Sequence, residues 1–88
     1  MKLDPNYLVQ NVGEDTILVP VGEAGLRFHG VIRLNETAAC LVQRLSTDAS
    51  REDLIRALGE RYEGTEEMFA RSVDDTISAL RKARAIID

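Results

Sequence analysis

The chain has 88 residues, of which 44% are hydrophobic and 30% charged, and its formal net charge is −4. This length leaves room for a single domain over residues 1–88, and the composition argues against a disordered tail. No apolar run approaches the roughly 20 residues that span a bilayer, and the start lacks the apolar core of a signal peptide. One cysteine and one histidine are too few for a disulfide or a zinc or iron–sulfur site. We therefore expect a cytoplasmic protein that binds no membrane, metal or cofactor.

The distribution of charge argues against nucleic acid as a partner. Eleven basic and fifteen acidic residues are spread along the whole chain. The one basic cluster, Arg81, Lys82 and Arg84, lies at the end of a predicted helix, where cations oppose the negative end of the helix dipole. Nucleic-acid binders need a basic stripe, because counterion release supplies most of their affinity. We expect no nucleic-acid binding.

The first third of the chain is predicted to form strands. Residues 7–12, 16–19 and 31–34 are three runs rich in β-branched and apolar side chains. A glycine-containing loop, residues 21–30, joins the second run to the third. Since the other connection is short, we expect an antiparallel three-stranded sheet with one covered face.

Three helices are predicted to follow, each beginning at a capping residue. Asn35, Ser50 and Thr65 are good N-caps, and Asp53 completes a capping box with Ser50. Gly64 is expected in the left-handed conformation that often ends a helix. Strands followed by helices predict an α+β domain with the helices on one face of the sheet.

The periodicities also predict which side chains form the core. Spacings of two in strands and about 3.6 in helices select twelve apolar residues. These are Ile17, Val19, Ile32, Leu34, Leu41, Leu45, Leu54, Leu58, Phe69, Val73, Ile77 and Leu80.

The residues that could do chemistry give no catalytic constellation. His29 lies in a loop with no partner in sequence, and Cys40 is expected to pack as a small hydrophobe inside a helix. Adjacent carboxylates such as Asp74 and Asp75 diverge by about 100° on a helix instead of converging on one ligand. We expect no catalytic residues and no enzyme activity.

One side of the third predicted helix carries mostly short or apolar residues. They are Met68, Ser72, Asp75, Ala79 and Ile86. Such a side allows either close approach of another helix or a shallow groove for a partner. Residues 31–34, if they lie at a sheet edge, could accept an extended peptide as an added strand, or Arg33 could simply block that edge.

The segment Gly30-Val31-Ile32-Arg33-Leu34-Asn35-Glu36-Thr37-Ala38-Ala39, a strand leading into a helix, resembles the PqqD family. These small proteins are associated with maturation of pyrroloquinoline quinone (PQQ) and of other ribosomally made, modified peptides. The resemblance extends from about residue 7 to residue 87. Ala85 stands where many members have glycine.

The resemblance implies a winged helix-turn-helix with three strands and three helices that acts as a peptide chaperone. The leader of a precursor peptide would add to residues 30–34, lie against the third helix and be presented to a modifying enzyme, often a radical SAM enzyme. From this we infer eleven peptide-binding residues, with the first two closing one end of the site. They are Phe28, His29, Gly30, Val31, Ile32, Arg33, Leu34, Met68, Arg71, Ser72 and Asp75.

Two alternatives stay open at this point. A winged helix could be a DNA-binding regulator, although no predicted helix has a basic face. The domain could also be a structural or oligomerisation module, and a homodimer is compatible with any of these functions.

Overall fold

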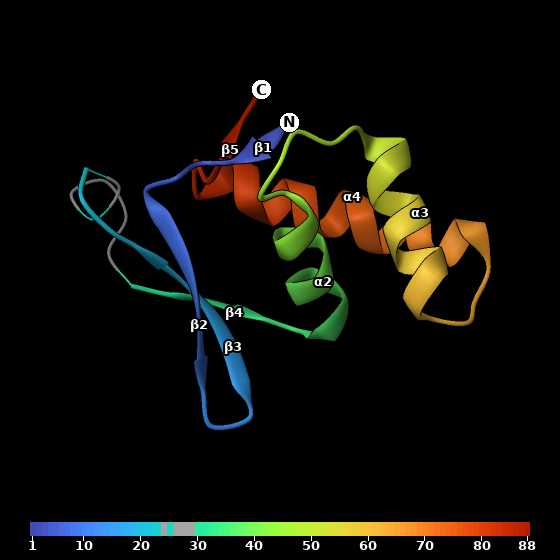
Figure 1. Ribbon diagram of the computed structural model, residues 1–88, viewed down its shortest axis with the longest axis horizontal. Coiled ribbons are helices and arrows are strands. Elements are labelled where there is room, and N and C mark those ends of the chain that lie inside the picture. The colour runs from blue at the N-terminus through green and yellow to red at the C-terminus, as the bar shows by residue number, and fades with distance from the viewer. Residues whose placement is uncertain (24, 26–29) are drawn as a thin grey trace.

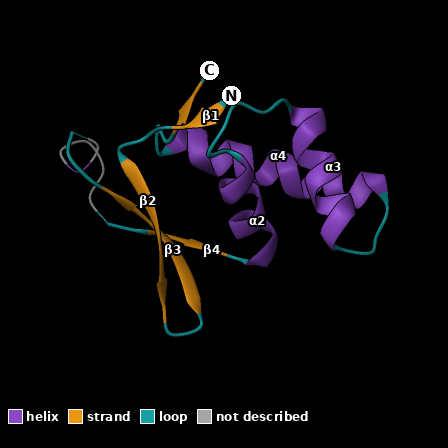
Figure 2. Ribbon diagram, in the orientation of Figure 1, coloured by secondary structure: helices purple, strands orange, loops and turns teal. Residues whose placement is uncertain are grey.

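A computed structural model describes residues 1–23, 25 and 30–88 (Figure 1). The strands are β1 (Lys2–Leu3), β2 (Tyr7–Val12), β3 (Asp15–Pro20), β4 (Ile32–Leu34) and β5 (Ile86–Ile87). The helices are α2 (Glu36–Arg44), α3 (Arg51–Arg61) and α4 (Glu66–Lys82). In Figure 2 the three longer strands lie to one side of the three helices. The predicted α+β order, a three-stranded antiparallel sheet followed by three helices, is confirmed.

The main sheet has the order β2-β3-β4, with β4 at one end. The register pairs Leu18 of β3 with Val9 on one side and Ile32 on the other. Pro20 pairs with Tyr7 of β2, beyond the part of β3 that β4 covers. Its missing amide therefore breaks no hydrogen bond to a third strand.

The two ends of the chain pair with each other, a pairing that is absent from the predicted elements. β1 and β5 form a separate two-stranded antiparallel sheet, with Leu3 opposite Ile86. The placement of Ile86 on one side of the third helix was therefore wrong. The helix ends earlier, because Arg84 takes a left-handed conformation with φ of 56°.

The turn after α4 has the hydrogen bonds of a Schellman motif. The Ala85 amide donates to the Leu80 carbonyl at 2.8 Å, and the Arg84 amide donates to the Arg81 carbonyl at 3.0 Å. Ala85 is fully buried in the core cluster, so the turn is anchored in the core and directs the chain into β5.

The face assigned to residues 16–19 was wrong. Leu18 is 0% exposed, whereas Ile17 and Val19 are half-buried and stand outside the core cluster. Leu18 shares its face with Val9 and Ile32, which pack against the core, so its two neighbours point away from the helices. In a run of three consecutive apolar residues, alternation alone does not reveal which face is buried.

The rest of the predicted core is confirmed. Leu34, Leu41, Leu45, Leu54, Leu58, Val73 and Leu80 are buried, and Ile32, Phe69 and Ile77 are half-buried against them. Cys40 is buried in the same cluster, as expected of a small hydrophobe.

All three predicted caps are present, but Gly64 does not end a helix in the left-handed conformation. The C-cap residue of α3 is Tyr62, which is extended, with φ of −129°. The described glycines with positive φ are Gly13, Gly22 and Gly30. Gly64 is constrained by space instead, because a Cβ there would lie 3.2 Å from the ring of Phe69.

Truncating Leu18 and Ile17 separately tests which face of β3 is buried in the core. Leu18→Ala should lower the free energy of unfolding by about 2–5 kcal/mol, because it opens a cavity in the core. Ile17→Ala should cost about 1 kcal/mol, since that side chain is only partly buried and stands outside the core cluster. Urea denaturation measures both, and equal losses would contradict the assigned face.

The left-handed Arg84 gives a second stability prediction. Arg84→Gly should raise the free energy of unfolding by about 0.5–1 kcal/mol, because glycine removes most of the steric cost at this φ. Arg84→Ala removes the same charge but keeps Cβ, so it should not stabilise. Thermal melts measure both variants. An equal increase in Tm for the two would show that loss of the charge, and not relief at this φ, is the cause.

Candidate functional site

The outer edge of β4 pairs with no strand in the described part of the chain. Along this edge Leu34 is 8% exposed and Ile32 is half-buried, whereas Val31 is 54% exposed and Arg33 is also exposed. The predicted alternation is therefore confirmed. The edge leaves backbone donors and acceptors available to an extended chain.

A groove of about 190 Å³ runs between this edge and α4. Its strand side consists of Ile32, Arg33 and Leu34, and Asp75 lies on its helix side. Four of the predicted peptide-binding residues, from segments some 40 positions apart, are thus brought together. The remaining lining residues are Asn35, Ala38, Thr76, Ala79 and Leu80.

The other predicted helix residues line a separate hollow. Met68, Arg71 and Ser72 surround a space of about 380 Å³ at the beginning of α4. Helical periodicity places Met68, Ser72 and Asp75 on one side of α4, so this hollow continues the direction of the groove. The structure does not join the two spaces into one pocket.

Some predicted residues lie before or outside the groove. Gly30 and Val31 precede β4 and are exposed, and Gly30 has φ of 123°, which favours glycine. Phe28 and His29 fall outside the described residues. Thr76 and Ala79 were missing from the predicted binding set, although the spacing that selected Ser72 and Asp75 also reaches Ala79.

The charged side chains of the groove are loosely held. The guanidinium of Arg33 lies 3.7 Å from the carboxylate of Asp15 on β3, and both side chains are mostly exposed. Such an exposed pair stabilises little, so Arg33 can exchange this partner for another anion. Asp75 forms no ion pair with a described residue.

Asp74, the neighbour of Asp75, serves a different purpose. Arg51 of α3 donates two hydrogen bonds to its carboxylate, at 2.8 and 3.0 Å. These bonds lower the pKa of Asp74. The two adjacent carboxylates therefore face different elements, as their divergence on a helix predicts.

The family model described as coenzyme PQQ synthesis protein D (PqqD) matches residues 15–86. The chain belongs to the PqqD family. A search of curated protein sequences gave no match.

Two solved structures share the PqqD fold of this chain over nearly its whole length. One is a lasso peptide synthetase B1 complexed with the leader peptide, with a TM-score of 0.74, 23% identity, and coverage of 99% of this chain and 96% of that one. The other is TbiB1 in complex with the TbiA(beta) leader peptide, with a TM-score of 0.75, 14% identity and full coverage of both chains.

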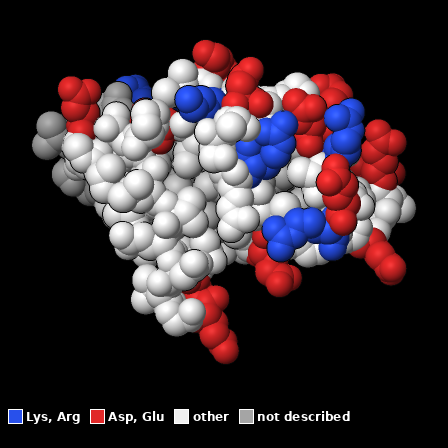
Figure 3. All heavy atoms as spheres, in the orientation of Figure 1, with Lys and Arg blue, Asp and Glu red and all other residues white. Residues whose placement is uncertain are grey.

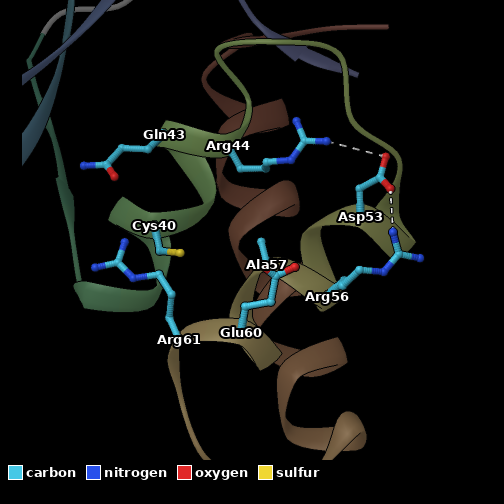
Figure 4. Close-up of a pocket in the computed structure, with 8 residues that line it drawn as sticks. All are labelled: Cys40, Gln43, Arg44, Asp53, Arg56, Ala57, Glu60 and Arg61. Atoms are coloured by element: carbon cyan, nitrogen blue, oxygen red, sulfur yellow. Dashed lines mark hydrogen bonds and ion pairs between the residues drawn. The ribbon is translucent and has the colours of Figure 1, made fainter.

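Another hollow of this PqqD-family chain, about 390 Å³, lies between α2 and α3 (Figure 4). Arg44 of α2 and Arg56 of α3 extend toward Asp53 from opposite sides, at 3.9 and 3.5 Å. Asp53 also accepts a hydrogen bond from the Ser50 amide at 2.9 Å, within the capping box. The Asp53 carboxylate is therefore committed to holding the start of α3.

Among the described residues, no group of three histidine, cysteine or acidic side chains could hold a metal ion. No helix in the described ranges has the length and apolar character needed to cross a bilayer.

Four aspartates that are ion-paired or cap a helix have lowered pKa values, so we expect the stability of the fold to decrease in acid. Hydrogen bonds from Ser50 lower the pKa of Asp53, chiefly through its backbone amide. The N-terminal amino group lowers the pKa of Asp48, and Arg51 and Arg81 lower the pKa values of Asp74 and Asp88.

A pKa lowered by folding adds stability that is present above the unfolded value of about 4 and is lost as pH falls through the folded value. The urea midpoint should therefore fall progressively as the pH is lowered below about 4. Asp53→Asn should flatten this dependence. A wild-type midpoint that rises on acidification would contradict the assignment.

Proposed function

We propose that this chain binds the leader segment of a ribosomally made precursor peptide as a strand added to β4. The observation that carries the proposal is a free strand edge beside a groove whose opposite wall is α4. Strand addition uses main-chain hydrogen bonds for affinity and side-chain pockets for selection. The two structural neighbours described as leader-peptide complexes support the same use of the fold.

The groove is suited to an extended peptide with small or branched apolar side chains. Ile32 and Leu34 offer an apolar floor, and Ala79 leaves space on the helix wall. On the peptide, side chains would alternate between the groove and the outer face of the sheet, where Val31 and Arg33 would flank them.

Charges at the groove provide a means of selection. Asp75 would favour a basic leader residue, whereas Arg33 and, further along α4, Arg71 would favour acidic ones. A partly buried charge-assisted hydrogen bond would contribute about 1.5–3 kcal/mol and an exposed pair under about 1 kcal/mol. In our proposal Met68 and Ser72 receive residues at the far end of the leader, and Phe28 and His29 close the near end.

We propose that the chain itself is a non-catalytic cytoplasmic adaptor, folded as one domain over residues 1–88. It would present the bound precursor to a separate modifying enzyme, with a radical SAM enzyme as the expected partner. The DNA-binding alternative is not favoured by the surface. In Figure 3, acidic and basic side chains alternate over the helices, without a continuous basic patch on that face.

The groove wall gives a matched pair of binding variants. Ala79→Gln should weaken leader binding at least tenfold, about 1.4 kcal/mol, because its side chain occupies the groove. Ser78→Gln places the same side chain one position away on an exposed part of α4 and should change binding little. Fluorescence anisotropy with the labelled leader of the cognate precursor measures both variants.

Amide chemical shifts during titration with the same leader locate the site. Changes should concentrate on residues 30–34 and on the side of α4 that contains Asp75 and Ala79. Changes centred on β2 or α3 would contradict the site. Lack of binding at about 100 μM, or −5.5 kcal/mol, would contradict the function.

A further inference from the structure

A second groove lies between α3 and α4 and is not used by the proposed function. It encloses about 570 Å³. Its apolar part is formed by Ile55 and Gly59 of α3 and by Phe69 of α4, which is half-buried. None of its lining residues borders the groove beside β4. The two grooves are therefore separate surfaces that share α4 as a wall.

The rim of this second groove is mainly acidic. Glu52, Glu60 and Glu66 line it, and none of the three forms an ion pair with a described residue. The one cation on the rim, Arg56, already lies 3.5 Å from Asp53. An apolar floor beneath unpaired carboxylates is complementary to an apolar side chain flanked by lysine or arginine.

The floor of this groove contains a glycine, Gly59, inside a helix. It lies within α3, where glycine is less favourable than alanine by roughly 0.5–1 kcal/mol. Packing does not require it, because a Cβ at this position would lie 3.8 Å from the Phe69 ring, which is an ordinary contact. The absence of a side chain at Gly59 costs helix stability and keeps the floor of the groove open.

We infer that the groove between α3 and α4 docks a segment of the enzyme that acts on the bound peptide. This inference rests on the proposed function. The segment carries an apolar side chain that sits over Gly59 between Ile55 and Phe69, and flanking lysine or arginine residues that pair with the rim glutamates. α4 then holds the peptide on one side and the enzyme on another, at a fixed relative position.

A blocked twelve-residue peptide, with leucines at helical spacing flanked by arginines, serves as the probe. Titration into ¹⁵N-labelled protein should give saturating shifts at Ile55, Gly59 and Phe69 below about 1 mM. Replacing its arginines by glutamate, or its leucines by serine, should abolish these shifts. Absence of saturation below 1 mM, or shifts centred on β4, would overturn the inference.

Substitutions distinguish the groove from the overall charge. Gly59→Gln should weaken probe binding at least tenfold while the Tm stays level or rises, because glutamine is the better helix former. Neutralising Glu52, Glu60 and Glu66 to glutamine should weaken it similarly. Neutralising Glu14, Glu23 and Glu36, which do not line the groove, makes the same change in net charge and should have little effect. Equal loss in the two triple variants would overturn the inference.

Leader binding, measured in the same variants, separates this inference from the function on which it rests. Gly59→Gln should bind the leader as tightly as the unsubstituted protein. A leader that binds normally while the probe fails to bind overturns the docking site alone. Sedimentation that shows a dimer abolished by Gly59→Gln would assign the groove to a second copy and would also overturn it.

Discussion

The position of the outer β4 edge depends on the junction where β4 becomes α2. Asn35 accepts a hydrogen bond from the Ala38 amide at 2.8 Å, so the chain enters a helix one residue after the strand ends. Leu34 anchors the other side of this junction in the core. The burial of Leu34 fixes which face of β4 meets the core, and the Asn35 cap fixes where the strand ends. The outer edge of β4 is therefore held beside α4, and the groove between them keeps its shape.

α4 does more than close the core. Val73 and Leu80 bury one side of it, and other residues of the helix border three separate hollows. The Schellman turn at Arg84 then directs the chain away from the helix and into a pairing with β1. This pairing ties down both ends of the chain, so the long helix presents its exposed sides from a fixed position.

This arrangement suits an adaptor that must hold one chain and approach another. An added strand gains affinity from backbone groups that any sequence possesses, so in our proposal the side chains along α4 would decide which leader is preferred. The groove between α3 and α4 shares no lining residue with the groove beside β4, so a partner docked there would not displace that leader. We propose no binding site at the hollow between α2 and α3. Arg44 and Arg56 there lie beside Asp53, and the carboxylate of Asp53 already caps α3.

The sequence by itself determined the features that local chemistry controls. Asn35, Ser50 and Thr65 were predicted as caps because a cap bonds within three residues of itself, and the faces of residues 31–34 followed from a mixed apolar and polar alternation. The tertiary structure decided what depends on distant partners. Leu18, not Ile17, entered the core because β2 and β4 set its register. Strands of two residues, such as β1 and β5, are too short to show a periodic pattern in the sequence. Asp75 lines the groove beside β4 and Met68 lines a separate hollow, and this division depends on how α4 packs against β4.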